Sequence, residues 1–372
     1  MTKSHWHYTR TDFLDTVFTM LVSGPVQAIS LFGPRRIGKT QFLQYDLAPR
    51  AEMYGHKVAY ASFWQMPTSP LAILLYELDQ AIRADPITTR LARGTLALSP
   101  KLRLRDPSRR GEIEIDLSDL KGKAPEDHLL LLDQYCEKLS NQKHPTILLF
   151  DEFQEILHAP EANAIMAALR TALDKRKTGL SVVFTGSSQS GLKRVFSQRD
   201  APFFNFATEI TLPPLPDAFV TQQLKAFHET YRGRVAAETA QAAFEDFDRN
   251  PLMFQIWLNA LPLNGFDDAA ARAQVTQQMA ETGGYDRTWL GLSPIQRAML
   301  RLLAEDVPQP TGQRGHDFLK TLTGTSFTTS QRQKAQKALA QRHLIDNWQG
   351  HWHLSDPLLK AWVLARPDRD FT

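Results

Sequence analysis

The sequence predicts an α/β fold in which parallel strands alternate with helices, and three observations support this prediction. The first apolar run leads directly into a glycine-bounded loop, and the third ends in two adjacent acids. Helical patterns separate the runs, an alternation that is typical of a parallel sheet with helices on both faces. Five short segments read as strands, at residues 26–32, 57–63, 146–150, 180–185 and 207–212, and the first, third and fourth of them read as buried.

The loop at residues 33–40 reads GPRRIGKT, which has the G-x-x-x-x-G-K-T spacing of a phosphate-binding P-loop. Its two glycines let backbone N–H groups turn toward a phosphate at a helix N-terminus. We expect Lys39 to reach the β- and γ-phosphates and the Thr40 hydroxyl to bind Mg²⁺. The cofactor-binding residues predicted for this loop are Gly33, Pro34, Arg35, Arg36, Ile37, Gly38, Lys39, Thr40 and Gln41.

The acids that end the third run are Asp151 and Glu152. Ligands bind at the carboxyl ends of strands in open α/β sheets, so both acids are expected at the nucleotide site. Asp151 suits the coordination shell of Mg²⁺, and Glu152 is placed to deprotonate an attacking water. Kinases of small molecules gain little from such a base, so this pair favours hydrolysis. The chain also lacks a guanine-binding N-K-x-D signature and an arginine-rich kinase lid.

A third candidate follows the fourth apolar run, where the chain reads Gly186-Ser187-Ser188-Gln189. A polar side chain at this strand end would lie beside the γ-phosphate and report whether it is present. The alternative interpretation is a plain glycine and serine turn.

After the strands the pattern becomes wholly helical, and the last part has winged-helix order, three helices followed by a tight hairpin. We therefore predict a P-loop NTPase parallel sheet with a helical lid and a C-terminal winged-helix domain. The third of these helices carries the cations Arg332, Lys334, Lys337 and Arg342, which are candidates for contact with double-stranded DNA. A packing module without DNA contact remains the alternative. The predicted domains are 1–215, with a β-hairpin insertion at 95–124, then 216–284 and 285–372.

Composition narrows the class of protein. Hydrophobic residues make up 42% and charged residues 22%, as in ordinary globular proteins. The net charge of +3 is too small to indicate a nucleic-acid partner, but residues 289–372 carry 11 Lys and Arg against 7 Asp and Glu. Cys136 is the only cysteine, which excludes an intramolecular disulfide. No apolar run reaches 18 residues and no signal core is present, so we expect a cytoplasmic protein without a membrane segment.

With these motifs assembled, the chain resembles the archaeal-type ATPase family, in the signal-transducing (STAND-like) branch of AAA-like P-loop ATPases. The resemblance implies an extra strand between the P-loop strand and the Asp-Glu strand, a helical lid and a winged helix. It also implies that Tyr8-Thr9-Arg10 lies near the adenine, which adds Arg10 to the binding residues, and that Ser187 senses the γ-phosphate, which is a catalytic role. The matching stretches are GPRRIGKT at 33–40, TILLFDEFQEI at 146–156, VVFTGSSQSGL at 182–192 and DPLLKAWV at 356–363.

The chain departs from the family at Phe206, where the family usually has an arginine. An arginine presented to a neighbouring subunit's phosphates raises hydrolysis by orders of magnitude. We therefore expect slow turnover, or an arginine supplied by Arg170, Arg194 or Arg199. The leading hypothesis is an ATP-hydrolysing switch whose nucleotide state controls the winged helix and its access to DNA. The rival hypothesis is a weakly hydrolysing signalling scaffold that acts through protein assembly, with another protein or as a homo-oligomer.

Overall fold

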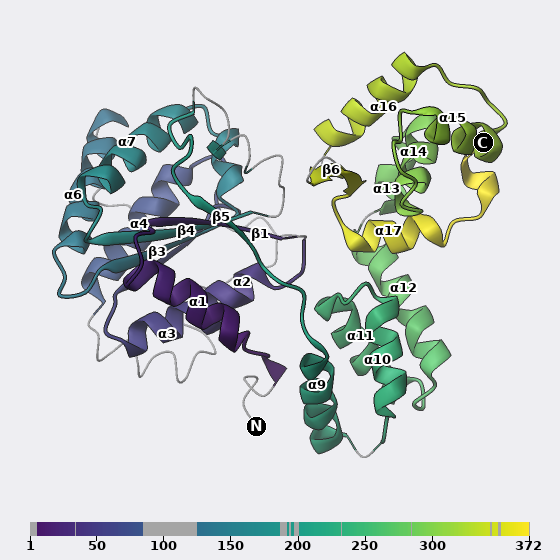
Figure 1. Ribbon diagram of the computed structural model, residues 1–372, viewed down its shortest axis with the longest axis horizontal. Coiled ribbons are helices and arrows are strands. Elements are labelled where there is room, and N and C mark those ends of the chain that lie inside the picture. The colour runs from purple at the N-terminus through teal and green to yellow at the C-terminus, as the bar shows by residue number, and fades with distance from the viewer. Residues whose placement is uncertain are drawn as a thin grey trace.

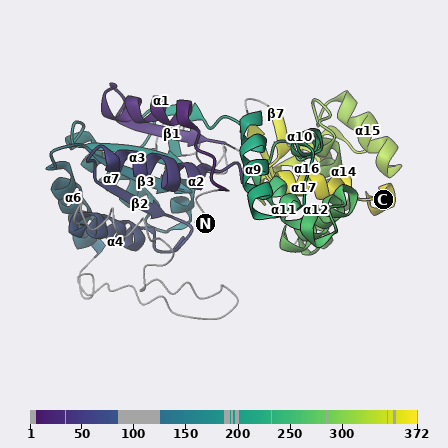
Figure 2. The same ribbon diagram turned by 90° about the horizontal axis from the view of Figure 1, so that it is seen from below.

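The computed structural model consists of a sheet covered by helices and a second, mainly helical part (Figure 1). Seen from below, the two parts occupy opposite ends of the molecule, and α9 (Asp217–Thr230) and β7 (His351–Leu354) lie on the side of the helical part nearest the sheet (Figure 2). The structure describes residues 6–33, 35–84, 125–186, 192, 195–196, 201–231, 233–283, 285–342, 344–348 and 351–371. The insertion predicted at 95–124 lies outside these residues.

The predicted parallel sheet is confirmed. Its strands run in the order β2-β3-β4-β1-β5, and every neighbouring pair is parallel. β4 lies between the P-loop strand β1 and the Asp-Glu strand β3, so the extra strand implied by the family resemblance is present. The five strands are β1 (Ala28–Phe32), β2 (Val58–Ser62), β3 (Thr146–Asp151), β4 (Leu180–Thr185) and β5 (Thr208–Thr211).

Helices cover both faces of this sheet. On β3, Leu148 and Phe150 pack toward one face, and Ile147 and Leu149 pack toward the other. Because a central strand is buried on both faces, it reads as a continuous apolar run instead of an alternating one. The first face is covered by α4 (Pro70–Arg83), α6 (Pro125–Ser140) and α7 (Ala162–Lys175), and the second by α1 (Thr11–Val22), the π-helical η2 (Phe42–Leu47) and α3 (Ala48–Met53).

The parallel arrangement determines where functional groups gather. β1, β3 and β4 all end at the same edge of the sheet, since neighbouring parallel strands point the same way. β1 leads there into the P-loop and the short α2 (Lys39–Gln41), and β3 leads into the 3₁₀ helix η3 (Phe153–His158). The two sequence motifs, more than 100 residues apart, therefore meet at one edge.

The C-terminal end of the second part has the predicted order of three helices, α14 (Pro294–Ala304), α15 (Gln313–Thr323) and α16 (Thr329–Gln341), and a hairpin, in which β6 (Ile345–Trp348) and β7 pair antiparallel. The helices before them are α9, α10 (Ala237–Asp246), α11 (Pro251–Leu263), α12 (Asp268–Gly283) and α13 (Tyr285–Leu290). The elements after the hairpin are α17 (Pro357–Leu364) and η4 (Asp368–Phe371). Within the described part of the chain, every helix is too short or too polar to span a lipid bilayer.

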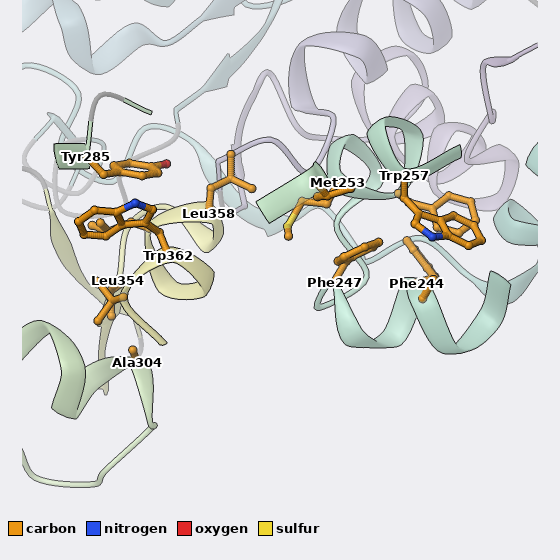
Figure 3. Packing of buried hydrophobic residues seen from close by; sticks show 14 of the residues in the cluster. Phe244, Phe247, Met253, Trp257, Tyr285, Ala304, Leu354, Leu358 and Trp362 are labelled. Carbon is orange, nitrogen blue, oxygen red and sulfur yellow. The ribbon is translucent and has the colours of Figure 1, made fainter. Parts of the chain in front are cut away.

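One cluster of buried apolar side chains runs through this whole second part, from Leu215 to Phe371. In Figure 3, Leu358 of α17 and Met253 of α11 lie between the group around Trp362 and the group around Trp257. The helices predicted as a lid and those of the winged-helix region therefore share a hydrophobic core. The boundaries at residues 215 and 284 remain predictions.

The prediction that Arg332 contacts DNA is wrong. Its side chain is only 5% exposed, and its guanidinium donates hydrogen bonds to the carbonyl oxygens of Phe327 and Thr311. Arg332 shares the inner face of α16 with Ala335 and Leu339, at the i, i+3, i+7 spacing of a buried stripe. The cations of α16 lie on different faces of the helix, and the number of cations in the sequence does not distinguish the buried face from the exposed one. Lys334 and Lys337 of the same helix are exposed, as is Arg342 beyond its end.

We expect Arg332→Met to lower the free energy of unfolding by about 3 kcal/mol, because two buried carbonyl groups lose their donor. The control Lys334→Met changes an exposed side chain of the same helix and should shift stability by less than about 0.5 kcal/mol. Urea unfolding followed by tryptophan fluorescence measures both. Equal stability of the two variants would contradict the structural role of Arg332.

Candidate active site

The P-loop forms a tight turn at the edge of the sheet. Gly38 has φ 101° and Arg36 has φ 66°, so the loop passes twice through the left-handed region. Glycine adopts that region without strain, which explains Gly38 at the start of α2. The Lys39 ammonium donates a hydrogen bond of 2.7 Å to the Gly33 carbonyl oxygen and so closes the loop on itself. Pro34 lies outside the described residues.

The Lys39 side chain is a buried cation. Burial lowers the pKa of its ammonium to about 8, while the Glu152 and Asp151 carboxylates oppose this shift and Arg35 adds to it. A bound phosphate would supply negative charge and restore the ordinary pKa. The loop therefore suits an anion at the position where the sequence predicts the phosphates.

Arg10 holds the P-loop from the N-terminal segment. Its guanidinium donates a hydrogen bond of 2.9 Å to the Ile37 carbonyl oxygen, and a Cβ atom on Gly38 would lie 3.4 Å from it. Arg10 is 8% exposed, and burial lowers its pKa to about 10 against the raising effect of Asp46 and Tyr8. Its Nε atom is buried and has no hydrogen-bond partner among the described residues. Arg10 thus lies at the predicted site and contacts the loop itself.

Three hydroxyl groups surround the buried Asp151 carboxylate. Its Oδ2 atom accepts hydrogen bonds from Thr40, at 2.7 Å, and from Tyr60, at 2.9 Å. Its Oδ1 atom accepts a very short one from Thr185. Burial raises the pKa of the Tyr60 phenol, and the Asp151 carboxylate raises it further, so this phenol stays protonated and donates.

The donors at this point suit a magnesium ion. Thr40 is exposed and Asp151 is 2% exposed, so a residue that solvent reaches is hydrogen-bonded to a buried carboxylate. Both supply oxygen, and Mg²⁺ in nucleotide sites is held by one or two carboxylate or hydroxyl oxygens together with water and substrate phosphates. Thr40 and Asp151 are therefore the residues that would hold it.

Glu152 directly follows the Asp151 carboxylate in an unusual backbone conformation. It adopts φ 53° and ψ 45°, in the left-handed region, and directly precedes the first residue of η3. Its amide N–H donates to the Thr185 hydroxyl at 3.3 Å, and its Oε2 atom accepts a hydrogen bond of 2.6 Å from the Gln154 side chain. The carboxylate is near enough to Lys39 to raise the pKa of that ammonium. Glu152 thus lies at the edge of the sheet where the sequence placed it.

The other predicted residues are placed as follows. Gln41 is exposed on α2, and the methyl of Ile37 packs within the loop at 3.2 Å from a Cβ position on Gly33. Arg35 is partly buried. The Arg36 guanidinium forms an ion pair of 3.3 Å with Asp356 at the N-terminus of α17. Ser187 lies outside the described residues.

Sequence reasoning missed three residues at this site, Tyr60, Thr185 and Gln154. Tyr60 is the middle residue of β2 and Thr185 is the last residue of β4, and these two strands flank β3. Their signal in the sequence is a single polar side chain within an apolar run or at its end. That signal becomes informative only when the order of the strands is known, because the order decides which strands lie beside Asp151.

Phe206, at the position where the family has an arginine, packs against Arg170 of the same chain. The Arg170 guanidinium lies 4.2 Å from the centroid of the Phe206 ring, and its Nε atom donates a hydrogen bond of 2.6 Å to Asp174. Arg170 is therefore engaged within its own chain, by a cation–π contact and an ion pair. Arg194 and Arg199 lie outside the described residues.

The chain has the fold of known Walker-type ATPases. A Walker-type ATPase of Pyrococcus abyssi aligns with a TM-score of 0.66 at 16% identity, over 97% of this chain and 99% of that one. The ORC2 protein of Aeropyrum pernix in its ADP form aligns with a TM-score of 0.54 at 14% identity, over 95% and 92% of the chains. Its ADPNP–ADP complexes give 0.51 at 15% identity, over 98% of both.

A scan against protein-family models and a search of curated proteins gave no match. The structural likeness therefore supports the P-loop ATPase fold implied by the sequence, and it does not support the narrower signal-transducing branch.

We expect the affinity for ATP to fall above pH 8. Below pH 8 the Lys39 ammonium is charged in both the free and the ATP-bound protein. Above pH 8 the ammonium of the free protein loses a proton, which must be taken up again when the phosphates bind. Affinity should then drop by up to about tenfold per pH unit, because one proton is taken up on binding. Calorimetric titration from pH 7 to 9.5 measures this effect. Lys39→Arg, which stays charged, should show no such drop, and a pH-independent wild type would contradict the assignment.

Proposed function

We propose that the protein is an ATP-binding and ATP-hydrolysing switch whose nucleotide state controls the position of the C-terminal helical part, and through it access to DNA. The assembled P-loop, the Asp151 cluster and Glu152 support the first half of this proposal. The ORC2 structures of the same fold were solved with ADPNP and ADP, which is consistent with a nucleotide at this edge of the sheet.

The observation that carries the proposal is the ion pair between Arg36 of the P-loop and Asp356 of α17. The two side chains are 28% and 13% exposed, and their charged atoms are 3.3 Å apart. Asp356 caps α17 through a 3.0 Å bond from the Leu358 N–H and accepts a 2.8 Å bond from the Tyr285 hydroxyl. Without this carboxylate, the guanidinium would face the positive end of the α17 dipole. One carboxylate therefore joins the phosphate-binding loop to the C-terminal part.

Nucleotide binding would compete for this contact. ATP brings several negative charges to the loop that presents Arg36, and the guanidinium can then pair with a phosphate in place of Asp356. A partly exposed ion pair contributes about 1 kcal/mol, which changes the ratio of two conformations about fivefold. This is enough to bias a switch without locking it.

The helices from α9 to η4 would move together, because a single apolar cluster joins them. Their covalent connection to the sheet is the segment 213–216, which contains three prolines and links β5 to α9. The N-terminal segment adds a second contact, since Gln222 and Gln223 of α9 donate to the carbonyl oxygens of His7 and Trp6 at 2.8 Å. The proposed motion is therefore a rotation of one body about a short, stiff connection.

For hydrolysis we assign one role to each group. Lys39 would bind the β- and γ-phosphates, and Thr40 and Asp151 would hold the metal ion. Mg²⁺ when bound neutralises phosphate charge and orients the triphosphate. Glu152 accepts a proton from the attacking water as the water oxygen forms a bond to the γ-phosphorus. At the same time the bond between the γ-phosphorus and the oxygen that bridges to the β-phosphate breaks. The products are ADP and phosphate.

The proposed contact with double-stranded DNA uses the exposed cations Lys334, Lys337 and Arg342. Arg342 also donates a hydrogen bond of 2.9 Å to the Gly291 carbonyl oxygen, which fixes its position. Cations on one helix neutralise phosphates and make binding salt-dependent. Arg332 takes no part in this contact, since its guanidinium is committed inside the domain.

A second function, assembly into a signalling complex with slow turnover, is favoured by the contact at Phe206. The aromatic ring stands where the family has an arginine, and Arg170 packs on that ring. A chain without such an arginine would hydrolyse ATP slowly and act chiefly through its bound state. Gel filtration with and without a non-hydrolysable ATP analogue would reveal assembly.

ATP turnover with and without duplex DNA, at low and moderate salt, tests the proposal. We expect Glu152→Gln to bind ATP but to lose turnover by about 10²- to 10⁴-fold, the contribution of a general base. DNA should raise wild-type turnover. Asp356→Asn keeps a helix-capping oxygen but loses the charge, so its turnover should no longer respond to DNA.

The control Lys334→Met/Lys337→Met should retain basal turnover and lose the response to DNA at lower salt than the wild type. Tight ATP binding with negligible turnover in wild type and Glu152→Gln alike, unaffected by DNA, would contradict the switch and favour the assembly function.

A further inference from the structure

Gln154 is a buried amide that contacts the carboxylate assigned as general base. It lies on η3, two residues after Glu152, and is 6% exposed. Its Nε2 atom donates to the Glu152 Oε2 atom at 2.6 Å and to the Glu155 Oε1 atom at 3.3 Å. No role for this residue follows from the P-loop or from the Asp-Glu pair.

The two carboxylates determine how the amide is oriented. An amide nitrogen carries two hydrogens, and each has one carboxylate acceptor here. The reversed amide would place Oε1 against two carboxylate oxygens, which repel it. Glu155 is itself held by His158, whose ring nitrogen lies 3.1 Å from its other oxygen. The amide therefore has one favourable orientation, with its N–H groups toward Glu152 and Glu155.

The end of β4 holds the other side of the amide. A Cβ atom on Gly186 would lie 2.3 Å from the Gln154 Oε1 atom and 1.6 Å from a methyl of Leu192. The absence of a side chain at Gly186 thus makes room for Gln154. Within the described residues, Oε1 is buried without a hydrogen-bond partner. The side chain is confined by packing, which suits a group that must hold another in place.

We propose that Gln154 is a positioning residue for Glu152, an inference that rests on the proposed hydrolysis. Its N–H group donates to one carboxylate oxygen, Oε2, and so sets the direction in which the carboxylate faces the attacking water. An amide does not titrate in this range, so Gln154 orients the base and does not take the proton from it. A base displaced by about 1 Å costs up to about 10²-fold in rate, which sets the scale of the effect.

The first test replaces Gln154 by methionine, which has a similar length but no donor. We expect kcat to fall 10- to 100-fold while the dissociation constant for ATP stays within twofold. Gln154→Glu places a carboxylate next to those of Glu152 and Glu155, which repel it, and should lower kcat further than Gln154→Met. A loss caused by packing alone would instead affect both variants equally.

The second test is a double-mutant cycle. If Gln154 acts through Glu152, then adding Gln154→Met to Glu152→Gln should cause no further loss of turnover. The matched control is Gln27→Met, because Gln27 donates a side-chain hydrogen bond of 2.7 Å to Leu173 at the opposite edge of the sheet. Its kcat should equal that of the wild type.

If Gln154→Met does not fold, as judged by circular dichroism, Glu155→Met carries the test. Glu155 is partly exposed and anchors only the second N–H of the amide, so kcat should fall a few fold with unchanged ATP affinity. Wild-type kcat in Gln154→Met, or an additive loss in the double mutant, would overturn the inference. Turnover that persists in Glu152→Gln alone would instead overturn the assignment of the base, so the two failures are distinguishable.

Discussion

The buried carboxylate of Asp151 is the constraint on which the candidate site depends. A carboxylate in this position costs several kcal/mol unless its oxygens are hydrogen-bonded. Thr40, Tyr60 and Thr185 supply three hydroxyl donors from three different elements. The P-loop helix, the middle of β2 and the end of β4 are therefore fixed around β3, and the oxygens proposed to hold magnesium are assembled in advance. Preorganised donors of this kind need little rearrangement during reaction.

The P-loop also connects regions that are far apart in the chain. Arg10 binds it from the N-terminal segment, Lys39 closes it on Gly33, and Arg36 reaches Asp356 near the C-terminus. The last contact adjoins the apolar cluster that runs from Leu215 to Phe371, since Leu358 of the same helix belongs to it. We propose that a change in charge at the loop reaches the helical part through this ion pair.

Much of the fold could be predicted because two signals were local. Continuous apolar runs predicted the three central strands and shorter apolar segments predicted β2 and β5, while the P-loop and Asp-Glu motifs predicted that Lys39, Thr40, Asp151 and Glu152 lie at one edge of the sheet. Tyr60, Thr185 and Gln154 could not be predicted, because their roles arise from hydrogen bonds to Asp151 and Glu152 that depend on strand order and on one turn of 3₁₀ helix. The pairing of Arg36 with Asp356 joins positions 320 residues apart, and Arg332 was misassigned because the faces of α16 were not separated.

The central claim is that nucleotide binding releases the C-terminal part from the P-loop, and a distance measurement tests it directly. Fluorophores at Met53→Cys on α3 and Leu290→Cys on α13 suit this purpose, since these sites are 58% and 78% exposed. The native Cys136 is buried and will not compete for label. We predict that an ATP analogue with Mg²⁺ changes the energy transfer between the labels and that Asp356→Asn shows the changed value without nucleotide. Identical transfer in all these states would contradict the claim.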